Sequence, residues 1–358
     1  MKKSLLALAV LGAFAGVASA QSSVTLSGTI DLSGKYVKND TVGRLVSMGT
    51  DGLNASQLVF SGTEDLGGGL KAGFDLSAGV AANSGGTYES ASGAGLNAKF
   101  FARRSIVRLM GGFGEVRLGR DYTPTFWNTA VFDPFGTVGV ANSLNLTHNT
   151  GTYGLNAVQP STYIWSDNAA SYFLPSGIGG VYGQVTAAPG QGGPGKYVGG
   201  RVGFAAGPFD IAAAAGRQDT VAGGATKYES FNLAGSYDLS VVKLMVQYNN
   251  EQRKGGVAGG PDATKETRWL LGAVVPMGQG EIHASYIRTD ETTELNRDAS
   301  QFALGYVYNL SKRTALYSTI AMIANKNLGT FTLGGATPDA TFPGKNSRGG
   351  EVGIRHFF

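Results

Sequence analysis

The chain has 358 residues, a formal net charge of +4 and no cysteine. Its 29 basic and 25 acidic residues are too nearly balanced for a nucleic-acid-binding protein, which would carry a strong basic excess. The lack of cysteine excludes disulfides and cysteine-ligated metal sites, and the 15 Tyr and 18 Phe beside 56 Gly argue against a glycine-rich disordered chain.

Residues 1–20 have the three parts of a secretory signal peptide: Lys2 and Lys3, an apolar run over 5–17, and the small residues 18–20. The apolar run is too short and too rich in Ala and Gly to favour a membrane anchor. We expect cleavage after Ala20, which leaves a mature domain at 21–358. Removal of the two lysines lowers the basic count from 29 to 27, against 25 acidic residues.

Alternating segments of about ten residues, the length of a strand in a transmembrane barrel, follow along the rest of the chain. We count sixteen, from VTLSGTIDLSGKY at 24–36 to EVGIRHFF at 351–358. In VKLMVQY at 242–248, the Val, Leu and Tyr side chains share one face, and Lys and Gln share the other. No long window has the period of an amphipathic helix, and no apolar stretch after residue 20 is long enough for a transmembrane helix.

The connections between these segments alternate in length. Links such as 65–69 and 111–114 are short, whereas 38–54 and 122–160 are long. Short periplasmic turns and long extracellular loops are typical of outer-membrane barrels, and lipid demands that such a sheet be closed. A β-sandwich or β-helix would not need this alternation. We therefore predict an all-β fold, a 16-stranded antiparallel transmembrane β-barrel.

The segment EVGIRHFF would be the closing strand, paired with the first strand of the barrel. Its terminal Phe358 would lie at the lipid–water boundary, where aromatic residues form a girdle.

Several motifs in this order resemble the trimeric general porins of Gram-negative outer membranes, particularly the betaproteobacterial branch. They are SSVTLSGTID (22–31), LVFSGTEDLGGGLKAGFDL (58–76), GGFGEVRLGRDYTPTFW (111–127), DPFG (133–136), NLSKRTALY (309–317) and Phe358. The resemblance covers essentially the whole mature chain. It implies a homotrimer in outer-membrane lipid, a passive water-filled channel for small hydrophilic solutes and ions, and a third loop folded into the lumen. It also implies that Phe358 is the signal read by the outer-membrane assembly machinery.

The third long connection, 122–160, is too apolar for a simple surface loop. Within fourteen residues it carries Tyr122, Phe126, Trp127, Phe132 and Phe135. Such a surface needs something to pack against, and the inner barrel wall would provide it. Asp133 and Pro134 would then form a rigid turn near the narrowest point. The alternative is an Ω-like loop that closes the top of the barrel.

Strand parity predicts which charged residues line the pore. In the fifth strand Val116 and Leu118 would face lipid, so that Glu115, Arg117, Gly119 and Asp121 face the lumen and Arg120 points outward. Lys71, Lys243, Arg201 and Arg268 also fall on polar faces, where they would be solvated lumen charges or contribute to selectivity.

The fourth strand leaves two arrangements open. The family motif matches Arg103 to an inward arginine of the constriction, which by parity would turn Arg104 and Arg108 outward. A cation facing lipid near the midplane costs about 2–4 kcal/mol. Either a bulge resets the parity, or a neighbouring subunit covers Arg104, Arg108 and Arg120, with Glu89 of the second loop as a candidate partner.

The resemblance also predicts the selectivity of the pore. Arg103 and Arg117 would face Asp133 and Asp121 on the folded-in loop, and such rings of charge set the ion preference of a channel. Gln57 and Trp165 stand where the family commonly carries inward arginines. We therefore expect a modest anion preference.

Other functions find less support in the sequence. His148, His283 and His356 are scattered and have no metal-ligand spacing, and neither G-x-S-x-G nor H-E-x-x-H occurs. We expect no enzyme activity, metal, cofactor or nucleic-acid partner. A substrate-specific outer-membrane channel remains the nearer alternative, and an adhesin or receptor barrel the more distant one.

Overall fold

The structure is a computed structural model that describes residues 23–40, 43–87, 99–147, 163–190, 196–219, 227–255, 263–292, 296–333 and 343–358. The predicted signal peptide lies outside these residues. The strands in the first half are β1 (Ser23–Asn39), β2 (Gly43–Thr50), β3 (Gln57–Gly67), β4 (Leu70–Ala81), β5 (Gly86–Thr87), β6 (Arg104–Gly111), β7 (Gly114–Tyr122), β8 (Trp165–Phe173) and β9 (Val181–Ala188). Those in the second half are β10 (Tyr197–Ala206), β11 (Phe209–Asp219), β12 (Lys227–Asp238), β13 (Lys243–Lys254), β14 (Ala263–Met277), β15 (Gly280–Glu291), β16 (Arg297–Asn309), β17 (Thr314–Asn327) and β18 (Ser347–Phe357). Between β7 and β8 lie the helix α3 (Pro124–Val131) and the 3-10 turn η1 (Ser143–Leu146).

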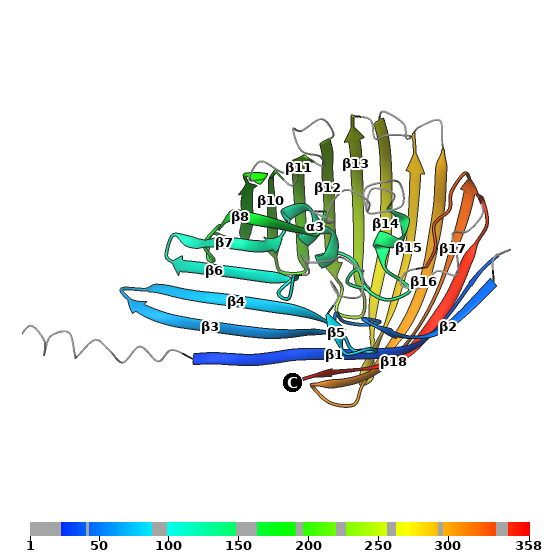
Figure 1. Ribbon diagram of the computed structural model, residues 1–358, viewed down its shortest axis with the longest axis horizontal. Helices are drawn as coiled ribbons and strands as arrows, with labels where there is room; N and C mark the ends of the chain where they lie inside the picture. The colour runs from blue at the N-terminus through cyan, green and yellow to red at the C-terminus, as the bar shows by residue number, and fades with distance from the viewer. Residues whose placement is uncertain are drawn as a thin grey trace, which may run out of the picture.

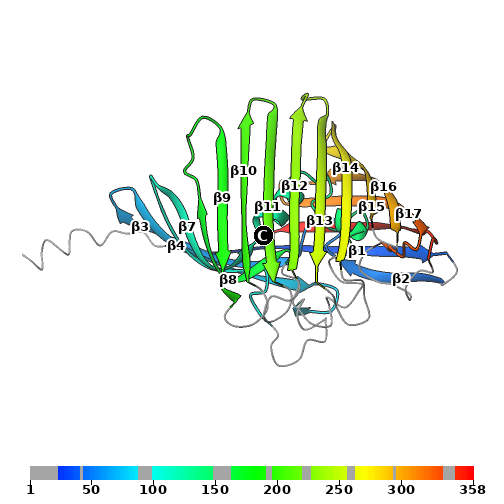
Figure 2. The ribbon, with the colours of Figure 1, turned by 90° about the horizontal axis from the view of Figure 1, so that it is seen from above.

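The described strands form one antiparallel sheet that closes into a barrel, because β1 pairs with β18 over Thr29–Asn39 and Ser347–Phe357. β2 and β3 both pair with β1 and share one position in the barrel, and the two-residue β5 pairs only with the end of β4. The eighteen strands therefore occupy sixteen positions, which confirms the predicted barrel. Figure 2 shows β9 to β14 standing side by side in the wall.

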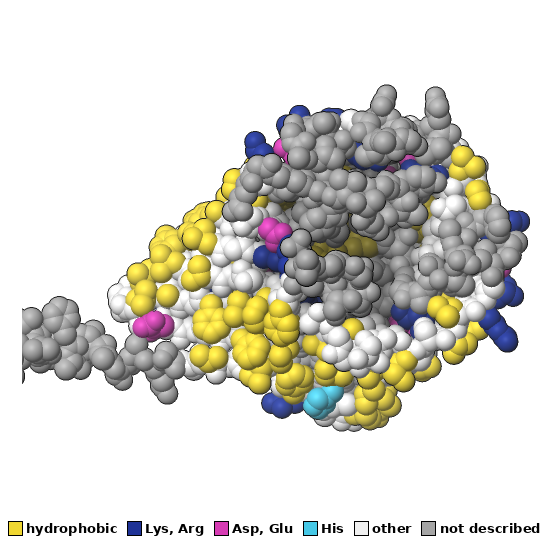
Figure 3. Space-filling view, in the orientation of Figure 1, with side chains coloured by type: hydrophobic (Ala, Val, Ile, Leu, Met, Phe, Trp, Pro, Cys, Tyr) yellow, Lys and Arg dark blue, Asp and Glu magenta, His cyan; other side chains and the backbone are white. Residues whose placement is uncertain are grey.

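The two faces of the wall differ as the alternation predicts. In β13, Leu244 and Val246 are about half exposed on the outer face. Gln247, on the inner face, is buried. In β18, Val352 and Ile354 are exposed, whereas Glu351 and Arg355 face inward and are buried. Apolar side chains gather over the part of the surface where β1, β3 and β4 lie (Figure 3). Lipid can therefore solvate the outer face.

Within the described residues, none of the helices has the length and apolar character needed to cross a membrane.

The prediction of a loop over 38–54 is wrong for residues 43–50, which form β2. The chain then leaves the wall as a turn at 51–56, which we call the inner turn, before β3 resumes the same barrel position. Asp31, buried on the inner face of β1, accepts hydrogen bonds from the backbone N–H groups of Gly52, Leu53 and Asn54 at 3.3, 2.8 and 2.7 Å. One carboxylate thus replaces the ladder partners that the turn has lost.

Candidate pore constriction

The connection between β7 and β8, which we call loop three, is described over residues 123–147 and 163–164, and this part lies inside the barrel (Figure 1). The side-chain amide of Asn128 on α3 donates to Asn232 of β12 at 2.7 Å and to the Ala212 carbonyl of β11 at 3.2 Å. Arg201 of β10 donates to Asn128 at 2.8 Å, and Gln247 of β13 donates to the Thr129 carbonyl at 2.9 Å. Inward-facing polar side chains of β10, β12 and β13, together with a backbone carbonyl of β11, therefore hold the helix.

The second half of the described loop packs on an apolar patch of the inner wall. Phe135, Val140 and Leu146 share a buried cluster with wall residues that include Leu270 and Ile287. Polar contacts fix the middle of this segment: the Val140 N–H donates to Glu351 at 2.7 Å, and Gln301 donates to the Ala141 carbonyl at 2.9 Å. The described part of loop three is thus packed against the inner wall of the barrel.

The inner turn and loop three approach each other across the lumen. A cavity of about 580 Å³ lies between the inner turn, Arg103, α3 and the start of β8. A second cavity of about 310 Å³ is lined by β1, β2 and the tip of loop three. Both are lined by Asp51, Thr137 and Val138, and we take this place, where the inner turn meets loop three, as the candidate constriction. No pattern in the sequence points to these three residues.

Arg104 and Arg108 face the lumen, so the prediction that they contact a neighbouring subunit is wrong. Arg104 pairs with Asp121 at 2.9 Å, and Arg108 with Asp75 at 3.3 Å. Val107, which lies between them along β6, is exposed on the outer face. The physical reason is that β6 begins at Arg104, so Arg103 precedes the strand and does not share its parity.

Arg120 does not point at lipid either, because its side chain is only 10% exposed. It pairs with Asp167 at 2.7 Å, donates to the Ala102 carbonyl and lies 5.2 Å from the Trp165 ring. A register shift between Gly119 and Asp121 accompanies this arrangement. Arg120 therefore has its partners within its own chain. Glu89 lies outside the described residues.

The prediction that Asp133 faces Arg103 and Arg117 across the pore is not met. Asp133 is buried in its own turn, where it accepts from the backbone N–H groups of Phe135 and Thr137 at 2.9 and 3.1 Å. Burial raises the pKa of this carboxyl. Its oxygens thus accept hydrogen bonds inside loop three, and Asp133 does not line either lumen cavity. Arg117 instead pairs with Glu115 and Asp121 on its own strand, at 2.8 and 2.9 Å.

Asp51 takes the place expected for Asp133. It lines both cavities and lies close enough to Arg103 for their charges to interact. Burial raises the pKa of Asp51 above its ordinary 3.8, against the opposing effects of the Ser56 N–H and of Arg103. An acid and a base thus line the same cavity.

The other predicted residues are spread along the lumen. Gln57 and Trp165 line the larger cavity, and Arg201 and the buried Arg268 hold loop three. Lys71 is exposed at the start of β4. His283 contacts the Pro134 carbonyl at 2.6 Å and Glu281 at 2.9 Å, while His148 lies outside the described residues.

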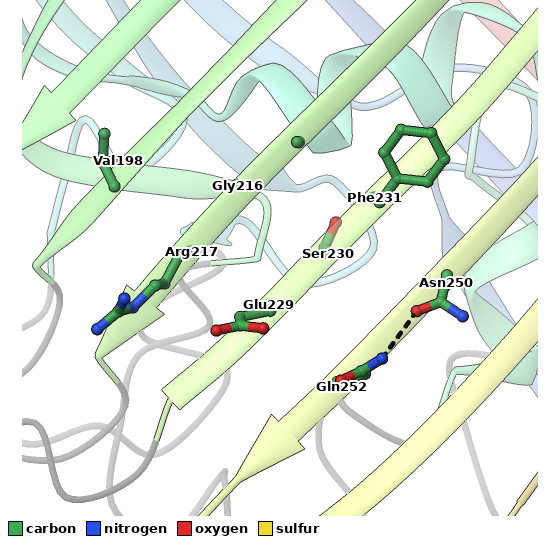
Figure 4. Close-up of a pocket in the computed structure, with 9 residues that line it drawn as sticks. Val198, Gly216, Arg217, Glu229, Ser230, Phe231, Asn250 and Gln252 are labelled. Atoms are coloured by element: carbon green, nitrogen blue, oxygen red, sulfur yellow. Dashed lines mark hydrogen bonds between the residues drawn. The ribbon is translucent and has the colours of Figure 1, made fainter.

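A further groove of about 450 Å³ lies across β10 to β13 on the outside of the barrel (Figure 4). Arg217, Glu229 and Gln252 border it, together with the exposed Val198 and Phe231 of the lipid-facing surface. Gln252 donates to Asn250 at 3.3 Å, the bond drawn in Figure 4. This groove is separate from the passage through the lumen.

Comparison with known proteins gives concordant matches over the chain. The family model described as Gram-negative porin matches residues 7–328. The chain is 37% identical to outer membrane porin protein 32 of Delftia acidovorans over 100% of both chains, and 29% identical to an outer membrane porin of Bordetella pertussis over 89% of this chain and 93% of that one. Among solved structures it resembles an anion-selective porin from Comamonas acidovorans, with a TM-score of 0.82, 34% identity, and coverage of 94% of this chain and 100% of that one. An OmpT structure of Vibrio cholerae, at 15% identity and a TM-score of 0.65, shares the fold.

Proposed function

The chain belongs to the Gram-negative porin family, and from that membership we propose that it is a general diffusion porin with a modest anion preference. The protein is an outer-membrane β-barrel. The observation that carries the proposal is the passage itself: two cavities in the lumen meet at Asp51, Thr137 and Val138, between the inner turn and loop three. Small hydrophilic solutes and ions would diffuse through this passage in either direction.

The anion preference follows from the charges around the passage. Arg104, Arg108 and Arg117 are matched on the wall by Asp75, Glu115 and Asp121, so this group is close to neutral. Arg103 lines the larger cavity together with Asp51, so that a cation stands at the wall of the passage itself. Low-dielectric walls concentrate the field of such a residue on the passing ion. The similar Comamonas porin is described as anion-selective.

The reversal potential of the channel in a salt gradient tests this proposal. Arg103→Ala should lower the anion-to-cation permeability ratio by a factor of about two to five, because a unit charge about 4 Å from an ion contributes about 1 kcal/mol in water. Arg117→Ala should lower it less, since Arg117 is held between two acids. Both effects should weaken at 1 M salt, where the Debye length is only about 3 Å and the charges are screened from the passing ion.

Asp51→Asn is the control of opposite sign, because it should raise the anion preference. Lowering the pH should act in the same direction as the acid is protonated, beginning above the ordinary carboxyl range because the pKa of Asp51 is raised. A wild-type preference for cations, or an unchanged ratio in Arg103→Ala, would contradict the placement of the constriction.

We also propose that the mature chain begins at Gln21 after signal cleavage and that three copies associate in the membrane. The resemblance to trimeric porins motivates the trimer. An exposed aromatic ridge on the outside of the barrel supports it. Phe100 is 54% exposed, its ring centroid lies 4.8 Å from that of Phe101, and the Phe101 centroid lies 6.3 Å from that of Phe60. Native mass measurement in mild detergent should give a trimer, and a purely monomeric species would contradict the assembly.

A further inference from the structure

Building on the proposed channel function, we propose that the 580 Å³ cavity beside the constriction is a binding subsite for single-ring aromatic monocarboxylates of the benzoate type. Cavities of about 300–1,000 Å³ with mostly apolar walls and a few polar groups are typical of small-molecule sites. Here the walls are aromatic, and the polar groups include one guanidinium, one carboxylate and the amide of Gln57.

Tyr122 is the centre of the aromatic wall. Its ring is stacked on Phe126 at a centroid distance of 5.5 Å and an interplanar angle of 20°. Trp127 lies 5.5 Å away at 39°, and Trp165 lies 5.9 Å away at 34°. All four rings line the cavity. A planar aromatic solute would extend this set of tilted and stacked rings in the offset geometry that aromatic pairs prefer.

The backbone brings these rings together from two directions. Tyr122 ends β7, and the helix that follows places Phe126 one turn further on beside Trp127. Trp165 begins β8 directly opposite Tyr122 in the ladder. The Trp127 side chain is 38% exposed although it lies inside the barrel. A purely aqueous passage does not need an exposed tryptophan at its narrow part, whereas a solute site would use it.

Two arginine side chains lie beside the same aromatic wall. Arg104 lies 5.4 Å from the Tyr122 ring and Arg103 lies 6.0 Å from the Trp165 ring. Arg104 is ion-paired with Asp121, and Arg103 lines the cavity itself. A guanidinium group suits a carboxylate because two parallel N–H groups match its two oxygens. The solute would place its carboxylate toward Arg103 and its ring on Trp165 or Trp127.

Asp51 restricts the charge of the solute. Its carboxylate lines the same cavity near Arg103 and would repel a second negative charge. The site should therefore favour a monoanion over a dianion, and the aromatic wall should favour a planar ring over an aliphatic chain. A benzoate-like acid satisfies both conditions.

The test is block of the KCl current through the full-length mature protein in a planar bilayer, with benzoate added on one side. Cyclohexanecarboxylate has the same charge and a similar size without a planar ring, acetate has the charge alone, and benzyl alcohol has the ring alone. Benzoate should block with a half-blocking concentration about fivefold lower than cyclohexanecarboxylate, the ratio that one favourable aromatic pair provides. Equal block by the two ring acids would overturn the proposal.

Two substitutions locate the subsite. Trp165→Leu and Trp127→Leu should each raise the half-blocking concentration of benzoate and leave that of acetate unchanged. Trp127 belongs to loop three rather than to the wall, so its variant remains informative if Trp165→Leu fails to assemble. Trp269→Leu is the matched control, because Trp269 is 51% exposed on the outer face of β14 and should have no effect on block. Unchanged benzoate block in Trp127→Leu would overturn the subsite, whereas absence of any KCl current would instead contradict the channel function.

Discussion

Deletion of Phe358 should remove nearly all heat-modifiable barrel from the outer membrane. Phe358 completes the closure of the sheet, because its N–H donates to the Gly28 carbonyl at 3.1 Å and its carbonyl accepts from the Gly28 N–H at 3.2 Å. Its ring covers Gly28 so closely that a Cβ atom there would clash with a ring carbon. The ring is 44% exposed at the edge of the outer surface, where an aromatic girdle residue is expected.

The loss of two hydrogen bonds would cost only about 1–3 kcal/mol, which is too little to abolish a barrel of sixteen positions. We therefore expect most of the effect to come from failed recognition by the assembly machinery. Phe358→Tyr, which keeps an aromatic terminus, should assemble. The deleted chain should still refold into detergent micelles, where no machinery is needed. Wild-type amounts of barrel in the outer membrane after the deletion would contradict the role of Phe358.

The barrel itself could be predicted because its cause is local. Alternation in segments such as VKLMVQY fixes which side chains meet lipid, and the structure places Leu244 and Val246 outside and Gln247 inside. The aromatic content of 122–160 likewise predicted that loop three must be buried. Both inferences need only the chemistry of nearby residues, and both agree with the structure.

The constriction could be predicted only in part, because its contacts join residues far apart in the chain. Glu351 accepts a hydrogen bond from Val140, which is 211 residues away in the sequence, and Asp31 accepts hydrogen bonds from the inner turn. No local pattern reports such pairs. The inner turn was missed for this reason, and Asp51 with it. Asp133 is different: aspartate in a turn commonly accepts hydrogen bonds from the backbone of that turn, and this signal could have predicted that its carboxylate is used there rather than opposite the arginines.

Parity was misleading where a strand begins or shifts. Arg103 and Arg104 are neighbours, yet Arg103 lines the cavity while Arg104 pairs with Asp121 on the lumen side of β6. Parity applies only within the ladder, and β6 begins between them. The shift between Gly119 and Asp121 has the same effect on Arg120. The predicted trimer contacts depended on these residues, so the trimer now depends on the family resemblance and the outer aromatic ridge.

Replacement of Arg268 by methionine should destabilise the folded barrel and loosen loop three. Glu251 and Glu266 lie directly opposite each other on β13 and β14, and Arg268 bridges them at 3.1 and 3.3 Å. All three side chains are 2% exposed. Arg268 also donates to Thr147 of loop three. Removal of the cation leaves two buried like charges facing each other, and breaking a buried ion pair typically costs about 3–5 kcal/mol.

The unfolding rate in SDS at a fixed temperature, followed by the loss of the heat-modifiable band, measures this cost as kinetic stability. Arg268→Met should unfold much faster than wild type, and its single-channel current should fluctuate more because Thr147 has lost its anchor. Arg288→Met is the matched control: Arg288 is 56% exposed, pairs with Asp290 at 2.7 Å, and as a surface ion pair contributes only about 0–1 kcal/mol. Adding Glu251→Gln and Glu266→Gln to Arg268→Met should restore part of the stability, because neutral amides no longer repel each other. If Arg268→Met unfolds no faster than Arg288→Met, the buried cluster is not the anchor of loop three.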